Sequence, residues 1–308
     1  MKKISIIVPV FYEAESISLL YKELIKVEEQ LYEREMEMEL IFVDDGSKDG
    51  SLQALLKIRE QRPNTKVIKL SRNFGAIQAS KTGMRFVTGD CFMLLAADLQ
   101  DPPALIVKMA ELWLAGHKFV ICVRNERNDP FLVKWFAYIY NKLVRLFVVK
   151  DFPKGGFDMA LMDRSMLDYL KNSSKNINHS LLAFWLGYRP EIISYERQER
   201  LHGKSGWTFS KRIKLFIDSL LGFSVVPIRL ISLFGICVSS LSLLYGMIIV
   251  IGAIYGTIVV QGFAAIVTLI SFLLGIVIFM LGVIGEYIVR IFDELNKRPE
   301  AVIDEIYE

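Results

Sequence analysis

The sequence predicts an α/β protein: a Rossmann-like, mostly parallel sheet domain, followed by amphipathic helices and a two-helix transmembrane hairpin. Two observations support this prediction. In the first 125 residues, short β-branched runs alternate with segments of helical periodicity, as in doubly wound folds. From Leu230 to Gly285 the chain has no Asp, Glu, Lys or Arg, which is long enough for two helices that each cross a bilayer.

Five runs in the first part are predicted to be strands, with helices between them. The strand runs are almost continuously apolar, as expected for a parallel sheet that is covered on both faces. They are KISIIVPV, MELIFVDD, KVIKLS, CFMLLAAD and KFVICVR, and helical periodicity covers 15–34, 49–61, 76–87 and 103–115. In such sheets, ligands bind at the carboxyl ends of the strands, so the residues after each run are the candidates for a site.

The uncharged region is predicted to form two membrane spans, Leu230 to Ile254 and Ala264 to Ile288, with a turn at 256–262. A helical hairpin buried in a soluble protein is the alternative, but soluble helices keep a polar face and these segments have none. Basic residues lie on the outer side of both spans, which predicts that both ends are cytoplasmic. These are Lys211, Arg212, Lys214 and Arg229 before the first span, and Arg290, Lys297 and Arg298 after the second.

Composition excludes several other classes. The N-terminal run is interrupted by Pro9 and reaches Glu13 too early for a signal peptide, so it is interpreted as a strand. Cys91, Cys122 and Cys237 lack metal-ligand spacing, which suits a reducing compartment without disulfides. The net charge of +3 is too small to indicate nucleic acid, and three scattered histidines do not suggest a metal site.

The predicted strands end in polar residues. Pro9, Tyr12 and Glu13 lie at or after the end of the first strand, Asp44 and Asp45 end the second, Arg72 and Asn73 follow the third, and Asp98 and Gln100 end the fourth. No GxGxxG or P-loop motif is present, so a different nucleotide site is predicted. Carboxylates can accept hydrogen bonds from a base or ribose, and the last pair offers hard oxygen ligands for a metal on a diphosphate. The stretch LLAADLQDPP alone fits a solvated loop equally well, and the recurrence at successive strands favours a site.

Four stretches in this order and spacing resemble the inverting glycosyltransferases of family 2, which have the GT-A fold. They are SIIVPVFYEAESI, FVDDGSKDGS, SRNFGAIQASKTG and ADLQDPP. LMDR at 161–164, ERQERLHGKSGWTFSK, the two spans and GEYIVRIFDELNKRP resemble one branch. That branch is the bacterial polyprenyl-phosphate glycosyltransferases, including bactoprenol glucosyltransferases, and it is similar to dolichyl-phosphate mannose synthases. The resemblance covers nearly the whole chain and is specific to the reaction class, though not to the sugar.

The resemblance implies a donor site and a metal site. The residues implied in nucleotide-sugar binding are Pro9, Tyr12, Glu13, Asp44, Asp45, Arg72, Asn73, Lys81 and Asp98. Asp98 and Gln100 are implied to hold Mg²⁺ or Mn²⁺. The family motif is usually Asp-x-Asp-x-Gln, and Ala96 stands here in place of the first acid. Water and diphosphate oxygens would then complete the octahedral shell, which Mg²⁺ tolerates.

The resemblance also implies that Asp98 and Asp158 are catalytic. The family often has Gly-Asp-Phe-Arg before Leu-Met-Asp-Arg, and this chain keeps the acid as Asp158 but has Ala160 in place of the arginine. An exposed loop carboxylate is the alternative. Two roles stay open for Asp158, because a lipid phosphate is mostly dianionic at neutral pH and hardly needs a base. It acts either as a base or as a group that positions charge near the anomeric carbon.

An anionic acceptor at a membrane surface needs cations and hydrogen-bond donors. The candidates are Arg124, Arg127, Arg200, Lys204 and Ser205. The basic residues at 211–214 are better explained by the positive-inside rule alone. Helical stretches at 131–149 and 208–226 mix aromatic, aliphatic and basic residues, which is typical of the headgroup region. For the first of them, an ordinary packed helix is an equal alternative.

The function expected from the resemblance is transfer of a hexose from a nucleotide sugar, first UDP-glucose or UDP-N-acetylglucosamine, to undecaprenyl phosphate for cell-envelope glycosylation. The expected parts are a cytosolic GT-A domain at 1–207, an interfacial region at 208–229, the spans at 230–288 and a cytosolic tail at 289–308. The protein is expected in the plasma membrane. A chain cut after Val226 is expected to keep donor binding.

Two alternatives stay open. A glycan polymerase of the same superfamily would need more spans and a Gln-x-x-Arg-Trp motif that is not in the chain. A non-catalytic membrane adaptor that binds nucleotide sugar is suggested by Ala96. Besides the donor, the acceptor and the lipid bilayer, the partners considered are a second copy of the chain, a downstream flippase and a second glycosyltransferase.

Overall fold

The computed structural model describes residues 1–125, 131–153, 156–175, 177–196, 218–219, 221–255, 263–296 and 298–308. These residues form two compact units. The first consists of Met1–Ser219 together with Arg298–Glu308, and the second consists of Leu220–Lys297. The last residues of the chain therefore belong to the same unit as the first ones.

The first unit is built on an eight-stranded sheet with the order β7-β5-β6-β4-β1-β2-β3-β8. Its strands are β1 Lys2–Val10, β2 Met36–Asp44, β3 Thr65–Leu70, β4 Cys91–Leu94, β5 Phe119–Arg124, β6 Met159–Asp163, β7 Glu191–Tyr195 and β8 Ile303–Tyr307. β6 and β8 run antiparallel to their neighbours, and the other pairs are parallel. This confirms the predicted α/β class with a mostly parallel sheet. β6, β7 and β8, of five residues each, are not among the predicted strands.

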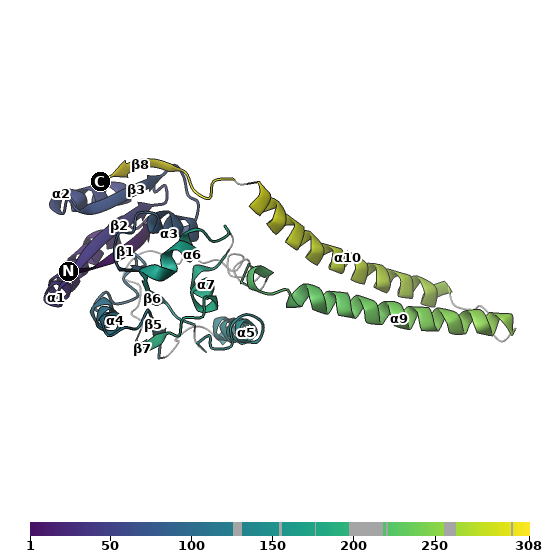
Figure 1. The fold of residues 1–308 in the computed structure, drawn as a ribbon. Helices are drawn as coiled ribbons and strands as arrows, with labels where there is room; N and C mark the ends of the chain where they lie inside the picture. The colour runs from purple at the N-terminus through teal and green to yellow at the C-terminus, as the bar shows by residue number, and fades with distance from the viewer. Residues whose placement is uncertain are drawn as a thin grey trace. The chain divides into compact units, whose positions relative to one another are not determined.

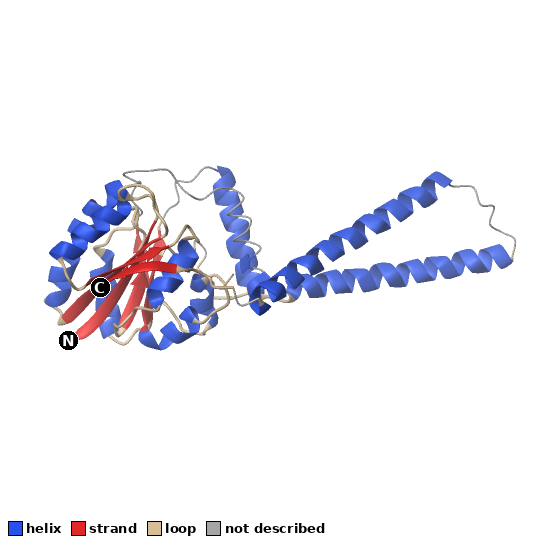
Figure 2. Cartoon of the chain, turned by 90° about the horizontal axis from the view of Figure 1, so that it is seen from above, coloured by secondary structure: helices blue, strands red, loops and turns tan. Residues whose placement is uncertain are grey.

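Helices cover both faces of the sheet (Figure 2). They are α1 Ala14–Tyr32, α2 Ser51–Gln61, α3 Ala76–Met84, α4 Leu105–Leu114, α5 Phe131–Phe147, α6 Leu167–Lys171 and α7 His179–Trp185. α1 contacts α2 and α4, whereas α3 contacts β1, β2 and α6. Neighbouring residues of β1 face opposite sides: Ile6 belongs to the core cluster with α1, and Ile7 lies against Gly83 of α3. A strand buried on both faces must be apolar throughout, which explains the continuous apolar runs in the sequence.

The strand directions bring the predicted site residues to one edge of the sheet. The carboxyl ends of β1 to β5 and of β7 share that edge, and the antiparallel β6 places its amino end there. Cys122 of β5 is paired with Met159 of β6, and Arg124 of β5 is paired with Tyr195 of β7. Asp158, directly before β6, therefore lies beside the end of β5.

β8, formed by the last residues of the chain, completes the sheet on the side of β3 (Figure 1). Ile306 lies opposite Ile68 in an antiparallel ladder. A bare β3 edge would present unpaired N–H and C=O groups, and β8 takes up these groups. The residues expected to form a tail thus contain the end of a helix, up to Leu295, and a strand of the first unit.

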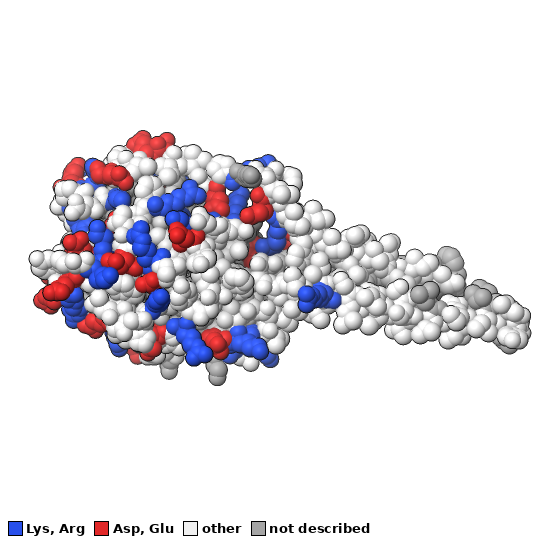
Figure 3. All heavy atoms as spheres, viewed as in Figure 1, with Lys and Arg blue, Asp and Glu red and all other residues white. Residues whose placement is uncertain are grey.

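The second unit contains two long helices, α9 Val226–Ile254 and α10 Phe263–Leu295. Each contains a segment that is long and apolar enough to cross a membrane, at Ile228–Ile249 and Phe272–Leu295. Their apolar side chains are exposed, as for Phe279 at 66%. Figure 3 shows charged side chains spread over the first unit, whereas few are visible on the two long helices. In the described residues these two helices are not buried, in contrast to the alternative of a helical hairpin within a soluble core.

Candidate active site

Asp45 fixes the loop that leads from β3 to α3. Its carboxylate oxygens accept hydrogen bonds from the backbone N–H groups of Phe74, at 2.7 Å, and Gly75, at 2.8 Å. Burial raises the pKa of Asp45, and these two hydrogen bonds oppose that shift. Both oxygens are engaged by the loop, so Asp45 has a structural role beside its predicted role in nucleotide binding.

Asp44 differs from its neighbour because one of its oxygens has no protein partner. Oδ1 accepts a hydrogen bond from Ser47 N at 3.3 Å, whereas Oδ2 is buried without one. Burial is the main cause that raises the pKa of Asp44. An unsatisfied buried carboxylate oxygen is unfavourable until a donor group reaches it. Asp44 is fully buried, so a hydrogen bond from the base or ribose of a ligand would require the loops at the strand ends to move.

The loop after β3 lies directly against the end of β2, because Gly46 has no side chain. A Cβ at Gly46 would come within 2.6 Å of the carbonyl carbon of Arg72, and its φ of +71° also favours glycine. This close approach places Arg72 and Asn73 beside the two carboxylates. The Arg72 guanidinium lies 4.1 Å from the centre of the Phe74 ring and donates to the carbonyl of Asn73. An exposed arginine fixed in this way is suited to bind a diphosphate.

The loop after β1 is bonded to the loop after β2. Tyr12 N donates to Ser47 Oγ at 3.2 Å, and Glu13 N donates to Ser51 Oγ at 3.0 Å. Tyr12 has a left-handed φ of 57° and an exposed ring. Such a conformation is unfavourable for a tyrosine, so the surrounding structure must hold it in place. Pro9 lies within β1 opposite Val43, so it shapes the strand end.

The loop after β4 carries the predicted metal ligands. Asp98 is buried, and its Oδ1 accepts a hydrogen bond from Gln100 N at 3.2 Å across Leu99, which has a left-handed φ of 57°. Within the described residues, no group of three or more His, Cys, Asp or Glu could hold a metal. One carboxylate and one amide oxygen still suit Mg²⁺ or Mn²⁺ when phosphate oxygens supply the other ligands. Ala96 is exposed, so an acid at that position would not enter the core.

Arg124 and Asp158 form a bidentate ion pair at the end of β5. Nε and Nη2 of Arg124 donate to the two carboxylate oxygens of Asp158. The side chains are 16% and 17% exposed, so the pair is reachable from solvent. Arginine has five N–H donors, and Arg124 can therefore hold Asp158 and still donate to an acceptor phosphate.

Tyr195 joins this ion pair to a second carboxylate. Its hydroxyl lies 3.0 Å from Asp158 Oδ2 and 2.5 Å from Asp101 Oδ1. A phenol has one proton, so it can donate to only one of the two carboxylates at a time. Burial, followed by Asp101 and Asp158, raises the pKa of Tyr195, and the hydroxyl stays protonated at neutral pH.

Neither Asp101 nor Tyr195 is among the site residues predicted from sequence. Asp101 belongs to the ADLQD stretch, so its position was a usable signal. Tyr195 ends a five-residue strand that the pattern does not reveal. Only the pairing of β5 with β7 places it beside Arg124.

The structure does not bring every predicted residue to this cluster. Lys81 is buried, and its Nζ donates to Glu300 Oε1 at 2.6 Å and to the carbonyl of Ser173. A contact between Lys81 and the nucleotide sugar would require these bonds to open. The other acceptor-site candidates lie outside the described residues; they are Arg127, Arg200, Lys204 and Ser205.

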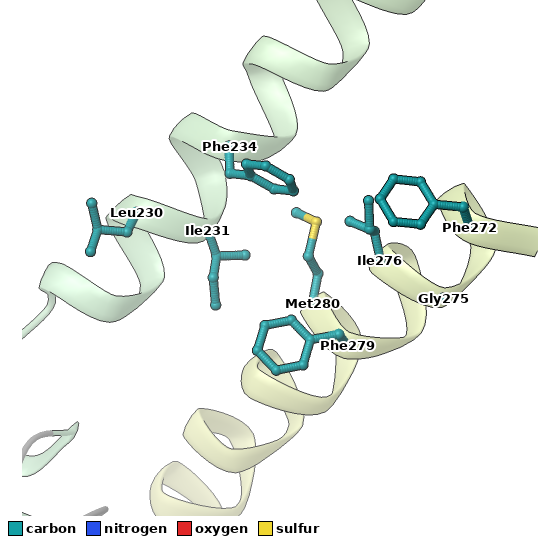
Figure 4. Close-up of a pocket in the computed structure, with 8 residues that line it drawn as sticks. All are labelled: Leu230, Ile231, Phe234, Phe272, Gly275, Ile276, Phe279 and Met280. Carbon is teal, nitrogen blue, oxygen red and sulfur yellow. The ribbon is translucent and has the colours of Figure 1, made fainter. Parts of the chain in front are cut away.

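The second unit has an apolar groove between α9 and α10, with a volume of about 600 Å³ (Figure 4). It is lined by Leu230, Ile231, Phe234, Phe272, Gly275, Ile276, Phe279 and Met280. None of these side chains can take part in acid–base chemistry. The groove is therefore suited to hydrocarbon and not to the reacting groups.

The chain is similar in sequence to known proteins over nearly its whole length. The sequence profile described as glycosyl transferase family 2 matches residues 5–170. The chain is 36% identical to the uncharacterized glycosyltransferase YkcC of Bacillus subtilis (strain 168), over 98% of this chain and 94% of the relative. It is 32% identical to the bactoprenol glucosyl transferase of Shigella phage SfX, over 98% of both chains.

Among solved structures, the chain is similar to the mannosyltransferase PcManGT from Pyrobaculum calidifontis, determined in complex with GDP-Man and Mn²⁺. The identity is 23%, the TM-score is 0.46, and the match covers 67% of this chain and 58% of that one.

Proposed function

Because the chain belongs to glycosyl transferase family 2, we propose that this glycosyltransferase transfers a hexose from a nucleotide sugar to polyprenyl phosphate, with inversion. The observation that carries the acceptor is that the similarity to a bactoprenol glucosyl transferase includes both apolar helices as well as the sheet. UDP-glucose and UDP-N-acetylglucosamine are the first donors to test, and undecaprenyl phosphate is the first acceptor.

The ends of β1 to β3 are the proposed donor side. The unpartnered Oδ2 of Asp44 would accept a hydrogen bond from the base or a ribose hydroxyl. The exposed Arg72 would bind the diphosphate, with Tyr12 and Asn73 beside it. Asp45 would support this site indirectly, because its carboxylate accepts hydrogen bonds from the backbone N–H groups of Phe74 and Gly75.

The loop after β4 is the proposed metal site. Asp98 and Gln100 would hold Mg²⁺ or Mn²⁺, and the bound ion would neutralise charge on the departing diphosphate. The incomplete protein ligand set is consistent with an ion that binds together with the donor.

The transfer would be a single in-line displacement. A lipid phosphate oxygen forms a bond to the anomeric carbon, the bond from that carbon to the β-phosphate oxygen breaks, and the nucleoside diphosphate leaves with the electron pair. One displacement inverts the configuration at that carbon. The ion pair of Asp158 with Arg124 would orient the incoming phosphate and stabilise positive charge on the sugar ring, whereas a dianionic phosphate needs no proton removed.

The two apolar helices would bring the enzyme to its lipid acceptor. A polyprenyl chain cannot leave a bilayer easily, because each exposed CH₂ costs about 0.8 kcal/mol. An enzyme that is anchored at the membrane can meet the lipid phosphate at the surface. We assign the first unit to the cytoplasmic side on the basis of the basic residues next to both spans.

The test uses the full chain in lipid nanodiscs that contain undecaprenyl phosphate, with a panel of nucleotide sugars and Mg²⁺. We expect one donor to give a lipid-linked monosaccharide, which mass spectrometry would detect. NMR of this product should show the anomeric configuration opposite to that of the donor. A lipid-linked polymer would favour a glycan polymerase. Nucleotide-sugar binding without transfer to any lipid would contradict the proposed acceptor.

A further inference from the structure

The segment after the second apolar helix is bonded to the first unit along its length. β8 pairs with β3, and the carbonyl of Val302 accepts a hydrogen bond from Ser71 N at 3.0 Å. Lys69 of β3 lies 2.6 Å from the carboxylate of Asp304. These contacts surround the start of the loop that carries Arg72 and Asn73.

An ion pair between a buried lysine and a partly exposed glutamate joins the same segment to α3. Lys81 Nζ lies 2.6 Å from Glu300 Oε1, and the two side chains are 4% and 21% exposed. His179 is buried nearby, and burial followed by Lys81 lowers the pKa of its imidazole to about 4, so it is neutral at pH 7. Among the described residues, Glu300 is therefore the carboxylate that balances the Lys81 charge. Removing Glu300 would leave the buried Lys81 ammonium without a counter-charge, which is unfavourable.

The donor loop at 71–75 is thus held from two sides. From the side of β2, Gly46 packs against its backbone, and Asp45 accepts hydrogen bonds from its last two N–H groups. From the C-terminal side, Val302 holds its first N–H group, and Glu300 holds α3, the helix into which the loop continues.

We propose that Glu300 is a positioning residue for the donor site: through Lys81 it keeps α3, and with it the loop that carries Arg72 and Asn73, in the conformation that binds nucleotide sugar. The inference rests on the proposed function, because it assumes that this loop binds the donor. It also revises the expectation for a chain cut after Val226. Such a chain lacks Glu300 and β8, so it should bind the donor weakly.

The test compares Glu300→Ala with the wild type as full chains in nanodiscs. Donor affinity is measured by calorimetry with the nucleotide sugar in the absence of acceptor, and the kinetics of transfer are measured separately. We expect the donor Kd and KM to rise at least about tenfold, while kcat at saturating donor changes less than about twofold. Glu60→Ala, which removes an exposed carboxylate from α2, is the matched control and should behave as the wild type.

A double variant separates positioning from direct contact. Lys81→Met with Glu300→Leu replaces the ion pair with apolar side chains of similar size, which buried sites often tolerate. If Glu300 acts by holding α3, donor affinity should return to within about threefold of the wild type. If the double variant binds as weakly as Glu300→Ala, Lys81 is itself a donor ligand and the inference is wrong.

Two further outcomes distinguish this inference from the proposed function. Wild-type affinity in Glu300→Ala overturns the inference alone, since the donor site is then intact without the carboxylate. A wild type that binds no nucleotide sugar overturns the proposed function and the inference with it. If Glu300→Ala does not fold, as judged by thermal unfolding, the double variant decides.

Discussion

The two sides of the strand-end site differ in how their carboxylates are satisfied. At the end of β2, Asp44 keeps a buried oxygen without a partner, whereas at the end of β5 both oxygens of Asp158 are bonded to Arg124. An unsatisfied acceptor gains a hydrogen bond when a donor reaches it, which is why we propose the first side as the side that binds the donor sugar nucleotide. A preformed ion pair needs little reorganisation as charge develops, which is why we propose the second side for the transfer step.

The largest effect is expected at Asp98, which lies between these two sides. Asp98→Ala should lower the rate of transfer by about three orders of magnitude. The reason is that the metal ion that would neutralise the leaving diphosphate loses a protein ligand. Chelation should abolish wild-type activity, and Mg²⁺ or Mn²⁺ should restore it. Asp168→Ala, at an exposed site on α6, is the control. Metal-independent transfer by the wild type would refute this role.

The next effect concerns the transfer side alone. Asp158→Asn should lower kcat about 100-fold or more, with the donor KM nearly unchanged, because Arg124 loses its counter-charge. If Asp158 positions charge, the rate of both proteins should follow ionisation of the lipid phosphate, with an apparent pKa of about 6. If it is a base, the wild-type profile should contain a carboxylate ionisation that the variant lacks. Full activity of the variant would exclude both roles.

A matched pair of substitutions can separate the roles of the two carboxylates at the end of β2. Asp44→Asn should weaken donor binding about tenfold, because a ligand loses a charged acceptor. Asp45→Asn should instead lower stability, by about 1–3 kcal/mol, because Phe74 and Gly75 donate to different oxygens and the amide would place an NH₂ donor against one of their N–H groups. Calorimetric titration and denaturant unfolding measure the two quantities. Equal loss of stability in both variants would remove the proposed distinction.

The stability of Asp44→Asn should also depend on pH. Because the folded-state pKa of Asp44 is raised by burial, the ionised carboxylate destabilises the fold above that pKa. The variant should therefore be at least as stable as the wild type at pH 7. This advantage should shrink as the pH falls and disappear below the unfolded-state value of about 3.9, because Asp44 is then protonated in both states. The same gain at pH 3 and pH 7 would contradict a titrating origin.

A smaller effect is expected where Tyr195 supports the ion pair. Tyr195→Phe removes the hydroxyl between Asp101 and Asp158, and should lower kcat about fivefold to tenfold without changing the donor KM. Tyr169→Phe is the control, because Tyr169 is an exposed tyrosine on α6. A change in donor KM instead of kcat would place Tyr195 on the binding side.

The smallest effect is expected at Ala96. Ala96→Asp restores the acid of the family motif at an exposed position, so stability should change by less than about 0.5 kcal/mol. Activity at low Mg²⁺ should rise, because the ion gains a protein ligand. A clear loss of thermal stability would show that the side chain at position 96 is packed.

The sequence predicted those parts of the molecule that depend on local pattern. Long apolar strands, two uncharged spans and polar residues at four strand ends are visible without a structure, because burial on both faces and a fixed strand direction determine them. The pairings of distant segments are not visible in this way. Tyr195 joins Asp101 to Asp158, and Lys81 meets Glu300 where the segment leading into β8 returns to the sheet. A residue that was expected to bind a ligand, such as Lys81, can therefore be engaged in an ion pair with a residue 219 positions away in the sequence.

The position of β8 at the end of the chain has a consequence for biosynthesis. Chains are made at about 5–20 residues per second, so the stretch between β7 and β8 takes about 5–20 s to synthesise. During that time both apolar helices emerge, while β3 has no neighbour on its outer side. An open strand edge can pair with another nascent chain. The enzyme should therefore complete its sheet only after the apolar helices α9 and α10 have left the ribosome. Aggregation is expected mainly between nascent chains on crowded polysomes, and less between finished proteins.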